Sequence, residues 1–235
     1  MFHSVYVQKR QPGVTYRDFQ RLWRSHGDFA ATVPAFWRNV ARYIHNDPVE
    51  DSAGLPNISV AHDAVGELFY TSLEAWLGMR DVMWREVAPD EARVFAGPPL
   101  SVRGERRVHQ PPTGPIKLFT LGRPRAGLAP AEFDRMADAY VAAARQSPGF
   151  GAALAGLTVT RAVRPPAAHA METVPQTASS HEWLVIYHFE SEHAARTALA
   201  SADYARLQVA EDGFLDWDSR LSLLCRGWML KDTTG

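Results

Sequence analysis

The sequence has one cysteine, no long apolar run and almost no net charge, and each of these features excludes a class of protein. The single cysteine, Cys225, excludes an internal disulfide framework and favours a reducing compartment. No uncharged apolar run approaches the roughly 20 residues of a membrane helix. A net charge of −1 gives no electrostatic reason to bind nucleic acid or an anionic membrane. The N-terminal stretch MFHSVYVQKRQPG lacks the long apolar core of a signal peptide. We therefore predict a cytoplasmic protein with neither nucleic acid nor a membrane as partner.

Motifs of cofactor and covalent chemistry are absent too. The sequence contains no GxGxxG or GxxxxGK stretch, so it indicates neither a nucleotide nor a flavin. Its nine histidines show no HxxxH or HxH spacing, so it indicates no metal site. There is no Gly-x-Ser-x-Gly elbow, and Cys225 lies in a strand-like apolar run, so no nucleophile for covalent catalysis is evident. We predict a protein that uses no cofactor and no metal.

Among the features present, an amphipathic helix over Thr15–Val33 stands out. Phe19, Leu22 and Trp23 form one apolar stripe, while charged residues occupy the opposite face. Thr15, followed three residues later by an acidic side chain, resembles a capping box, so the helix should begin there. His26 lies seven positions after Phe19, two helical turns along, and should therefore point with the aromatic side chains toward the core.

The remaining pattern predicts a β-α-β-β-α-β unit written twice. A Pro-rich stretch at His109–Pro115 separates the two copies. A long loop over Asp47–Ala61 and a Pro/Ala/Ser-rich loop over Arg164–Ser180 are expected within the copies. The expected strands are Phe2–Gln8, Asn39–Asn46, Asp63–Tyr70, Leu100–Val108, Ile116–Leu121, Leu157–Val163, Trp183–Phe189 and Leu221–Leu230. The expected helices, besides the first, are Leu73–Trp84, a short piece from Pro89 to Phe95, Ala129–Gln146 and Ser191–Ala210.

Residue matches at a constant offset support the repeat. Gly13, Val14, Asp18, Phe19, Arg21 and Leu22 correspond to Gly127, Leu128, Glu132, Phe133, Arg135 and Met136. Two such units are two ferredoxin-like units, each a four-stranded antiparallel sheet with helices on one face. The two bare sheet faces most simply cover each other. We predict an α+β fold in which domains 1–110 and 115–235 form a pseudo-dimeric α+β barrel within one chain, with a further homodimer as an option.

Several motifs of the first copy resemble the EthD family of the dimeric α+β barrel superfamily. They are the KRQPG turn at Lys9–Gly13, Tyr16, Phe19 and Trp23 followed by His26, the strand HDAVGELFYTSLE at His62–Glu74 and the segment APDEARVF at Ala88–Phe95. The match departs from the family at Asp63-Ala64, where EthD sequences usually have Asp-Gly. The second copy matches in pattern but not in motif, with Tyr140 where His26 stands and Glu182 near the place of Asp63.

The resemblance implies a small cavity between sheet and helices, and relatives that act without a cofactor as lyases, cyclases, isomerases or monooxygenases on aromatic or polyketide-like molecules. Such a family constrains fold far more than reaction. The unequal match of the two copies implies that the first keeps the family's site while the second has diverged.

His26, Asp63 and Tyr43 are the candidate catalytic residues. A histidine in an apolar stripe can serve as a general acid or base because its pKa lies near neutrality; the alternative is a buried histidine bonded to backbone. Asp63 could orient His26 or hold a substrate hydroxyl, or serve as a turn residue at the strand entry. Tyr43 and His45 alternate onto one strand face and could donate hydrogen bonds to a carbonyl, or pack and face solvent respectively.

A second set of residues is expected to bind the substrate. His62 should point away from Asp63, Asp90 could instead cap a helix, and His188 is either a buried histidine or the remnant of a site. The aromatic members would line a cavity for a flat ligand, although large core side chains are the simpler role. The set is Tyr6, Trp23, Trp37, His62, Phe69 and Asp90.

Two functions are consistent with these residues. The first is a cofactor-independent cyclase, dehydratase, lyase or isomerase of secondary metabolism, in which His26 moves a proton on an aromatic or polyketide-like substrate. The second is a non-catalytic protein that carries such a metabolite, with a cofactor-free monooxygenase as a further alternative. The surroundings of His26 discriminate between the first two. A ring that faces a cavity beside a carboxylate favours the enzyme, and a ring bonded only to backbone favours the carrier.

Overall fold

An eight-stranded closed barrel forms the centre of the molecule. A computed structural model describes residues 1–163 and 179–234, so the loop expected over 164–180 lies almost wholly outside the described residues. The strands follow the order β1-β3-β2-β8-β5-β7-β6-β4 around the barrel, and all neighbouring pairs are antiparallel. The expected mixed α and β fold with a closed barrel is confirmed.

Each half of the chain contributes four consecutive strands to the barrel and covers them with its own helices. The first half contains β1 (Phe2–Gln8), α1 (Tyr16–Thr32), α2 (Pro34–Asn39), β2 (Val40–Pro48), β3 (Ala64–Tyr70), α3 (Leu73–Val82), a π-helical turn (Met83–Val87), α4 (Ala88–Val94) and β4 (Leu100–Gln110). The second contains β5 (Ile116–Gly122), α5 (Pro130–Gln146), β6 (Gly156–Ala162), β7 (Trp183–Phe189), α6 (Glu192–Leu199), α7 (Ala202–Glu211) and β8 (Leu221–Asp232). Short 3-10 turns occupy Ser52–Gly54, Gly151–Ala153 and Trp217–Ser219.

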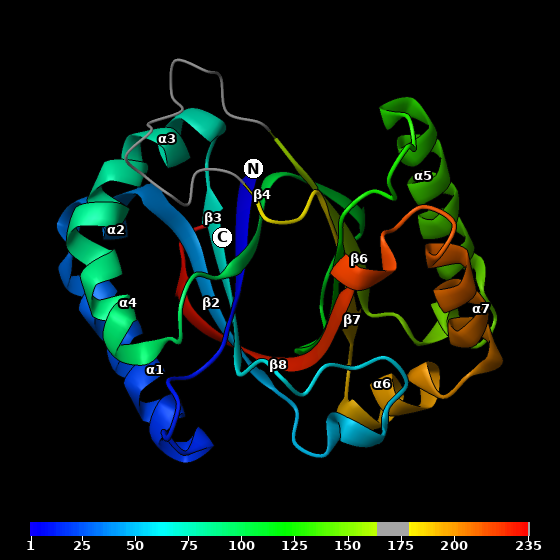
Figure 1. Cartoon of the computed structure of the whole chain (residues 1–235), viewed down its shortest axis with the longest axis horizontal. Coiled ribbons are helices and arrows are strands. Elements are labelled where there is room, and N and C mark those ends of the chain that lie inside the picture. The colour runs from blue at the N-terminus through cyan, green and yellow to red at the C-terminus, as the bar shows by residue number, and fades with distance from the viewer. Residues whose placement is uncertain (164–178, 235) are drawn as a thin grey trace.

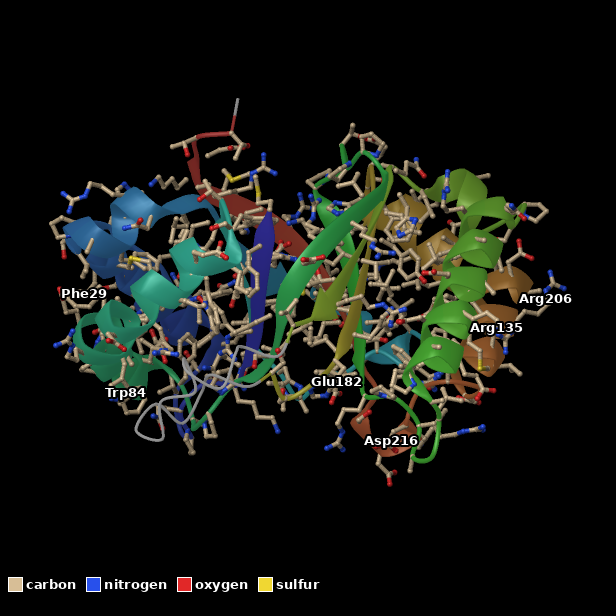
Figure 2. All side chains as sticks on the ribbon, turned by 90° about the horizontal axis from the view of Figure 1, so that it is seen from above. Phe29, Trp84, Arg135, Glu182, Arg206 and Asp216 are labelled. Carbon is tan, nitrogen blue, oxygen red and sulfur yellow. The ribbon has the colours of Figure 1, made fainter. Side chains whose placement is uncertain are left out.

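The helices lie in two groups on opposite sides of the barrel. Helices α1 to α4 cover the strands of the first half, and α5 to α7 cover those of the second (Figure 1). In the view from above, Phe29 and Trp84 lie on the outer margin of the first group, and Arg135 and Arg206 on that of the second (Figure 2). Each sheet therefore has one face toward its helices and one face toward the interior of the barrel.

Helix starts agree closely with the expected capping residues. The side chain of Thr15 accepts a hydrogen bond from the backbone N–H of Asp18, and Ser72 and Ser191 cap α3 and α6 in the same way. These caps satisfy N–H groups that have no partner within the helix, and so they set the first turn of each helix.

Three local features differ from the expectation. Residues 34–39 form the short helix α2, which begins at a proline in its first position. The helix expected over Leu73–Trp84 changes to π-helical geometry at Met83. The helical stretch after Ser191 is two helices, because Ser201 caps a new helix, α7, by accepting from the N–H of Tyr204.

The interior of the barrel is apolar at one end and polar at the other. Its apolar cluster brings together both halves and includes Val5, Val102, Phe119, Leu184 and Cys225. At the polar end Lys117 of β5 donates a hydrogen bond of 2.5 Å to Glu67 of β3, and both side chains are almost fully buried. The ammonium group, together with His3, outweighs the effect of burial and lowers the pKa of Glu67. A buried ion pair thus joins the two halves.

None of the helices in the described part of the chain is both long enough and apolar enough to span a membrane.

Candidate functional site

A cavity lies between the sheet of the first half and helices α1, α3 and α4. Its volume is about 80 Å³, and it is open to solvent at one side. The π-helical turn forms one wall through Met83, Trp84 and Val87, and Trp84 is 40% exposed. Such turns occur frequently at functional sites. The polar residues that line the cavity are Ser4, Tyr6, Gln8, His26, Tyr43, Tyr70, Arg80, Glu91 and Arg103.

His26 meets a carboxylate at the wall of this cavity. Its Nδ1 lies 2.8 Å from Oδ2 of Asp90, which belongs to the first turn of α4. The imidazole is buried, and the edge of its ring packs against Phe95. Arg93 donates a hydrogen bond of 2.9 Å to the other oxygen of Asp90, so the carboxylate is held from both sides. The expected direction of His26 is confirmed, and its partner is a carboxylate rather than backbone.

Burial and hydrogen bonding set the protonation states of this pair. Burial lowers the pKa of His26, although the nearby Asp90 carboxylate favours the charged form. Burial disfavours ionisation of Asp90, but the hydrogen bonds from Arg93 and His26 outweigh it and lower the pKa of that carboxyl. A neutral His26 therefore donates from Nδ1 to the Asp90 carboxylate and keeps a lone pair on Nε2. This arrangement prepares Nε2 to accept a proton.

Tyr6 and Tyr43 bring two hydroxyl groups to the same cavity. Their oxygens lie 3.0 Å apart, and Nε2 of His45 lies 2.8 Å from the Tyr43 oxygen. Burial raises the pKa of Tyr6 and of Tyr43, so both keep their protons at neutral pH. The expected common face of Tyr43 and His45 is confirmed, and His45 is buried rather than exposed.

The structure adds three charged residues that sequence reasoning missed, namely Arg80, Glu91 and Arg103. Glu91 lines the cavity, and burial raises its pKa to about 7. Arg103 of β4 also lines it, with Nη1 3.0 Å from the hydroxyl of Ser101, and burial lowers its pKa to about 10. Each looks like an ordinary surface charge in the sequence. An alternating strand pattern that places Arg103 on the same face as Ser101 was the only available signal.

Asp63 and His62 lie away from the cavity. Asp63 accepts hydrogen bonds from the backbone N–H of Arg10 and from its guanidinium, at 2.9 and 2.8 Å. The expectation that Asp63 orients His26 is therefore wrong. Its role is to fix the turn after β1, because a side chain at the start of β3 faces the end of β1 in this antiparallel pair. His62 contacts the hydroxyl of Ser59 instead of lining the cavity.

The expected aromatic lining is only partly correct. Tyr6 lines the cavity, whereas Trp23 lies behind it and stacks on the ring of His45, with 4.1 Å between the centroids. Trp37 is partly exposed and packs beneath Lys231. Phe69 stacks on His3 inside the barrel. Phe69 was misplaced because successive strand residues point to opposite faces, and its neighbours Leu68 and Tyr70 are the ones that face the cavity.

The equivalent region of the second half is packed by side chains. Tyr140 of α5 donates a hydrogen bond of 2.5 Å to Glu211 and accepts one of 2.7 Å from Tyr187. Arg220 pairs with Glu211 at 3.0 Å. Rings of Phe133, Trp183 and Phe214 fill the space around them. His188, the other candidate in this half, lies in the barrel interior with Nδ1 3.3 Å from the carbonyl oxygen of Gly114.

No group of three or more His, Cys, Asp or Glu side chains within residues 1–163 and 179–234 has the arrangement of a metal site.

The comparison with protein families matches a segment of the first half of the chain. The family model of the EthD domain matches residues 11–99, which include α1, β3 and α4. No curated protein sequence matches the chain. Among solved structures, a protein from Fusobacterium nucleatum provisionally described as a monooxygenase is similar over 100% of this chain and 95% of its own, with 8% identity and a TM-score of 0.57.

Two further solved structures share the fold. One is provisionally described as a chlorite dismutase and covers 97% of this chain and 94% of its own, with 11% identity and a TM-score of 0.55. The other is a variant of chlorite dismutase from Candidatus Nitrospira defluvii, which covers 97% and 90%, with 8% identity and a TM-score of 0.51. At these identities the likeness concerns the fold alone.

Proposed function

We propose that the protein is an enzyme that moves a proton on a small aromatic or polyketide-like molecule held in the cavity of its first half, where residues 11–99 match the family model of the EthD domain. The observation that carries this proposal is the 2.8 Å contact between His26 Nδ1 and the Asp90 carboxylate, with the ring at the cavity wall. A side chain that only filled space would not need a charged partner, and drawing the Asp90 carboxylate partly out of water costs free energy.

The proposed chemistry is general acid/base catalysis without a cofactor. Nε2 of His26 takes a proton from a carbon next to a ligand carbonyl, the C–H electron pair moves into the enolate, and the charge settles on its oxygen. Asp90 stabilises the imidazolium that forms, as a carboxylate does for a catalytic histidine. A tyrosine hydroxyl of the cavity stabilises the enolate oxygen. Return of the proton to another carbon is an isomerisation, and attack of the enolate on a second carbonyl is a cyclisation.

The chain is best understood as a pseudo-dimer of two ferredoxin-like units. The first half follows the strand order β4-β1-β3-β2 and the second follows β8-β5-β7-β6, so the two halves correspond strand by strand. His26 and Tyr140 occupy equivalent positions on α1 and α5. One half thus keeps a cavity with a titratable base, and the other has exchanged the base for a tyrosine within a filled core.

Exchange of deuterium into 1-tetralone, a bicyclic aromatic ketone, tests the proposal without knowledge of the natural substrate. In D2O the protein should accelerate incorporation of deuterium at C2, measured by NMR. Replacement His26→Gln should lower this rate by ~10²–10⁴-fold, the usual contribution of a positioned base. The matched control Tyr140→Phe, at the equivalent position of the other half, should change it little.

The outcome also separates the enzyme from a carrier. If 1-tetralone raises the melting temperature of the protein but exchanges no faster than in buffer, the chain binds such molecules without acting on them. A His26→Gln protein that melts several degrees lower yet keeps the full exchange rate makes His26 a structural residue. Both results contradict the proposed proton transfer.

A further inference from the structure

Four side chains, two at the cavity wall and two behind it, form a continuous row of hydrogen bonds. The row begins at Arg24 on α1, whose Nη1 lies 3.0 Å from Nδ1 of His45. It continues from Nε2 of His45 to the hydroxyl of Tyr43 over 2.8 Å, and from there to the hydroxyl of Tyr6 over 3.0 Å. Only Tyr43 and Tyr6, its last two members, reach the cavity wall.

Donor and acceptor chemistry gives the row one direction at its start. An arginine guanidinium has five N–H donors and no acceptor, so Nδ1 of His45 must be the acceptor. A neutral imidazole carries its hydrogen on the other nitrogen, which makes Nε2 the donor to Tyr43. His45 stays neutral because burial lowers its pKa well below the usual value, and the charge of Arg24 acts in the same direction.

The same donor-to-acceptor order continues from Tyr43 to Tyr6. The Tyr43 oxygen accepts from His45, and its buried O–H needs an acceptor, since an unpaired buried hydroxyl costs about 1–3 kcal/mol. Within the described part of the chain, the Tyr6 oxygen is the acceptor the structure offers to that O–H. Hydrogen bonds in such a row strengthen one another when they run in the same sense. The O–H of Tyr6 is then left to point into the cavity as a donor.

Close packing holds each member of the row in place. Arg24 also pairs with Asp47, which fixes its guanidinium. The ring of His45 stacks on Trp23 with 4.1 Å between centroids and an interplanar angle of 14°. An added Cβ at Gly27 would lie 3.0 Å from His45 Cε1 and 2.8 Å from Leu230 Cδ1, so glycine at this position lets α1 lie close to His45 without displacing the ring.

We infer that Arg24 and His45 are positioning residues that lock Tyr6 as a hydrogen-bond donor, so that the cavity selects ligands with a carbonyl or enolate oxygen beside Tyr6. The inference rests on the proposed function of the cavity as a ligand site. It adds that the charge of Arg24 never meets the ligand and acts only through the tautomer of His45. Oxygen recognition is thereby fixed by the protein before any ligand binds.

Two probe molecules that differ at one carbon test this selection. 1-Tetralone has a carbonyl where tetralin has a methylene group. The dissociation constant of tetralin divided by that of 1-tetralone measures the carbonyl preference. Tyr6→Phe should reduce that ratio about threefold to tenfold, the value of one hydrogen bond. Arg24→Met should reduce it similarly although Arg24 does not line the cavity. Arg21→Met, on the exposed face of the same helix, is the matched control and should leave the ratio unchanged.

Two spectroscopic measurements show whether the effect follows the proposed route. The C=O stretch of bound 1-tetralone should lie at lower frequency in the natural protein than in Tyr6→Phe or Arg24→Met. Long-range proton–nitrogen NMR spectra of the unliganded protein should show His45 with hydrogen on Nε2. Hydrogen on Nδ1, or a carbonyl preference that Tyr6→Phe leaves unchanged, overturns the inference.

These results are independent of proton transfer. If the preference responds to Tyr6 and Arg24 but no deuterium exchange is catalysed, the donor assignment stands and the proposed enzyme function fails. If exchange is catalysed and depends on His26 while the preference is unaffected by both variants, the enzyme stands and the donor assignment fails.

Discussion

Two ionisable side chains of the cavity have pKa values displaced in opposite directions by the same physical cause. Burial disfavours charge, so it lowers the pKa of the base His26 and raises that of the acid Glu91 to about 7. At neutral pH a neutral imidazole therefore stands in one cavity with a carboxyl group that is partly protonated. Pairs of groups separated in this way are typical of acid/base sites.

The pH dependence of deuterium exchange should follow from these directions. Exchange requires the neutral form of His26, whose pKa is lowered from 6.5, so the loss of rate caused by protonation of His26 should be centred below pH 6.5. Asp90 raises the pKa of His26, so Asp90→Asn should move this fall to still lower pH. Glu91→Gln should remove any inflection near pH 7.

A pH–rate profile of the natural protein and the two variants makes the test. A fall centred at or above pH 6.5 that does not move in Asp90→Asn would mean that another group is the base.

For single residues, the sequence predicts which way a side chain points better than it predicts which residue that side chain contacts. Helical spacing is enough to place His26 on the core-facing stripe of α1, because the period of a helix is fixed. Its partner Asp90 lies 64 positions later, on a different helix, and was assigned to ligand contact or a helix cap. Contacts across such a separation depend on how two elements pack, which local periodicity does not contain.

Between elements, the pairing of β1 with β3 determines whether Tyr6 can reach the cavity. Gly66 of β3 lies directly opposite Tyr6, and the phenol ring lies over it. A methyl group at Gly66 would come within 2.1 Å of Tyr6 Cζ, closer than van der Waals contact allows. The glycine thus provides the space that the row of hydrogen bonds requires.

Gly66→Ala should therefore displace Tyr6. We expect a loss of about 1–3 kcal/mol in the free energy of unfolding, as for an overpacked core, together with loss of the carbonyl preference. Gly78→Ala is the matched control, since Gly78 lies inside α3 with nothing within 4 Å of an added methyl group. That change should stabilise the protein by about 0.5–1 kcal/mol.

Urea unfolding of both variants measures these effects. A Gly66→Ala protein as stable as the natural one, with the carbonyl preference intact, would show that Tyr6 has another position open to it.

Elements with strong local signals were predicted well, and those created by packing were not. Capping side chains at Thr15 and Ser72 fix where helices begin, and both starts were correct. Helix α2 was missed, because its six residues, PAFWRN, have too little length for a periodic pattern. The π-helical turn at Met83 was missed as well. Its residues lie in the cavity wall, and their sequence carries no local preference for π-helical geometry.

At the scale of the whole molecule, the ion pair between Glu67 and Lys117 couples the halves inside the barrel. Removal of one partner leaves a buried charge, so Lys117→Met or Glu67→Gln alone should cost about 3–5 kcal/mol of unfolding free energy. The double variant should cost less than the sum of the two, by about 0.5–3 kcal/mol, because it leaves no unpaired charge.

A double-mutant cycle in urea measures this coupling. If the losses of unfolding free energy in the two single variants added exactly to that of the double variant, the ion pair would contribute no stability beyond its separate groups, in spite of its 2.5 Å separation.

The closed barrel is the level at which the sequence was most informative. Matches such as Phe19 with Phe133 at a constant offset predict a duplicated unit, and duplication predicts two sheets with equivalent bare faces. Closure follows because bare apolar faces must be buried. Which half keeps an open cavity does not follow from duplication. It depends on how far aromatic side chains such as Phe214 fill the second half, and that is a matter of packing volume.

Separation of the halves should reveal their dependence on each other. In the barrel β2 pairs with β8 and β4 pairs with β6, and these two seams are the places where one half meets the other. A chain that ends at residue 110 would expose both seams as strand edges, together with apolar interior residues such as Val5 and Val102. Unpaired edges beside an apolar face bind other strands.

Residues 1–110 and 115–235, expressed separately, should therefore aggregate or form homodimers, whereas mixing them during refolding should give a 1:1 complex with one cooperative thermal transition. Size-exclusion chromatography with light scattering and calorimetry measure both properties. The uncut chain supplies the reference melting temperature, and Lys117→Met in the second piece should weaken the complex by removing the ion pair that crosses the interface. Two pieces that remain soluble, monomeric and cooperatively folded would show instead that each sheet tolerates a bare face, and that the barrel is an association of independent domains.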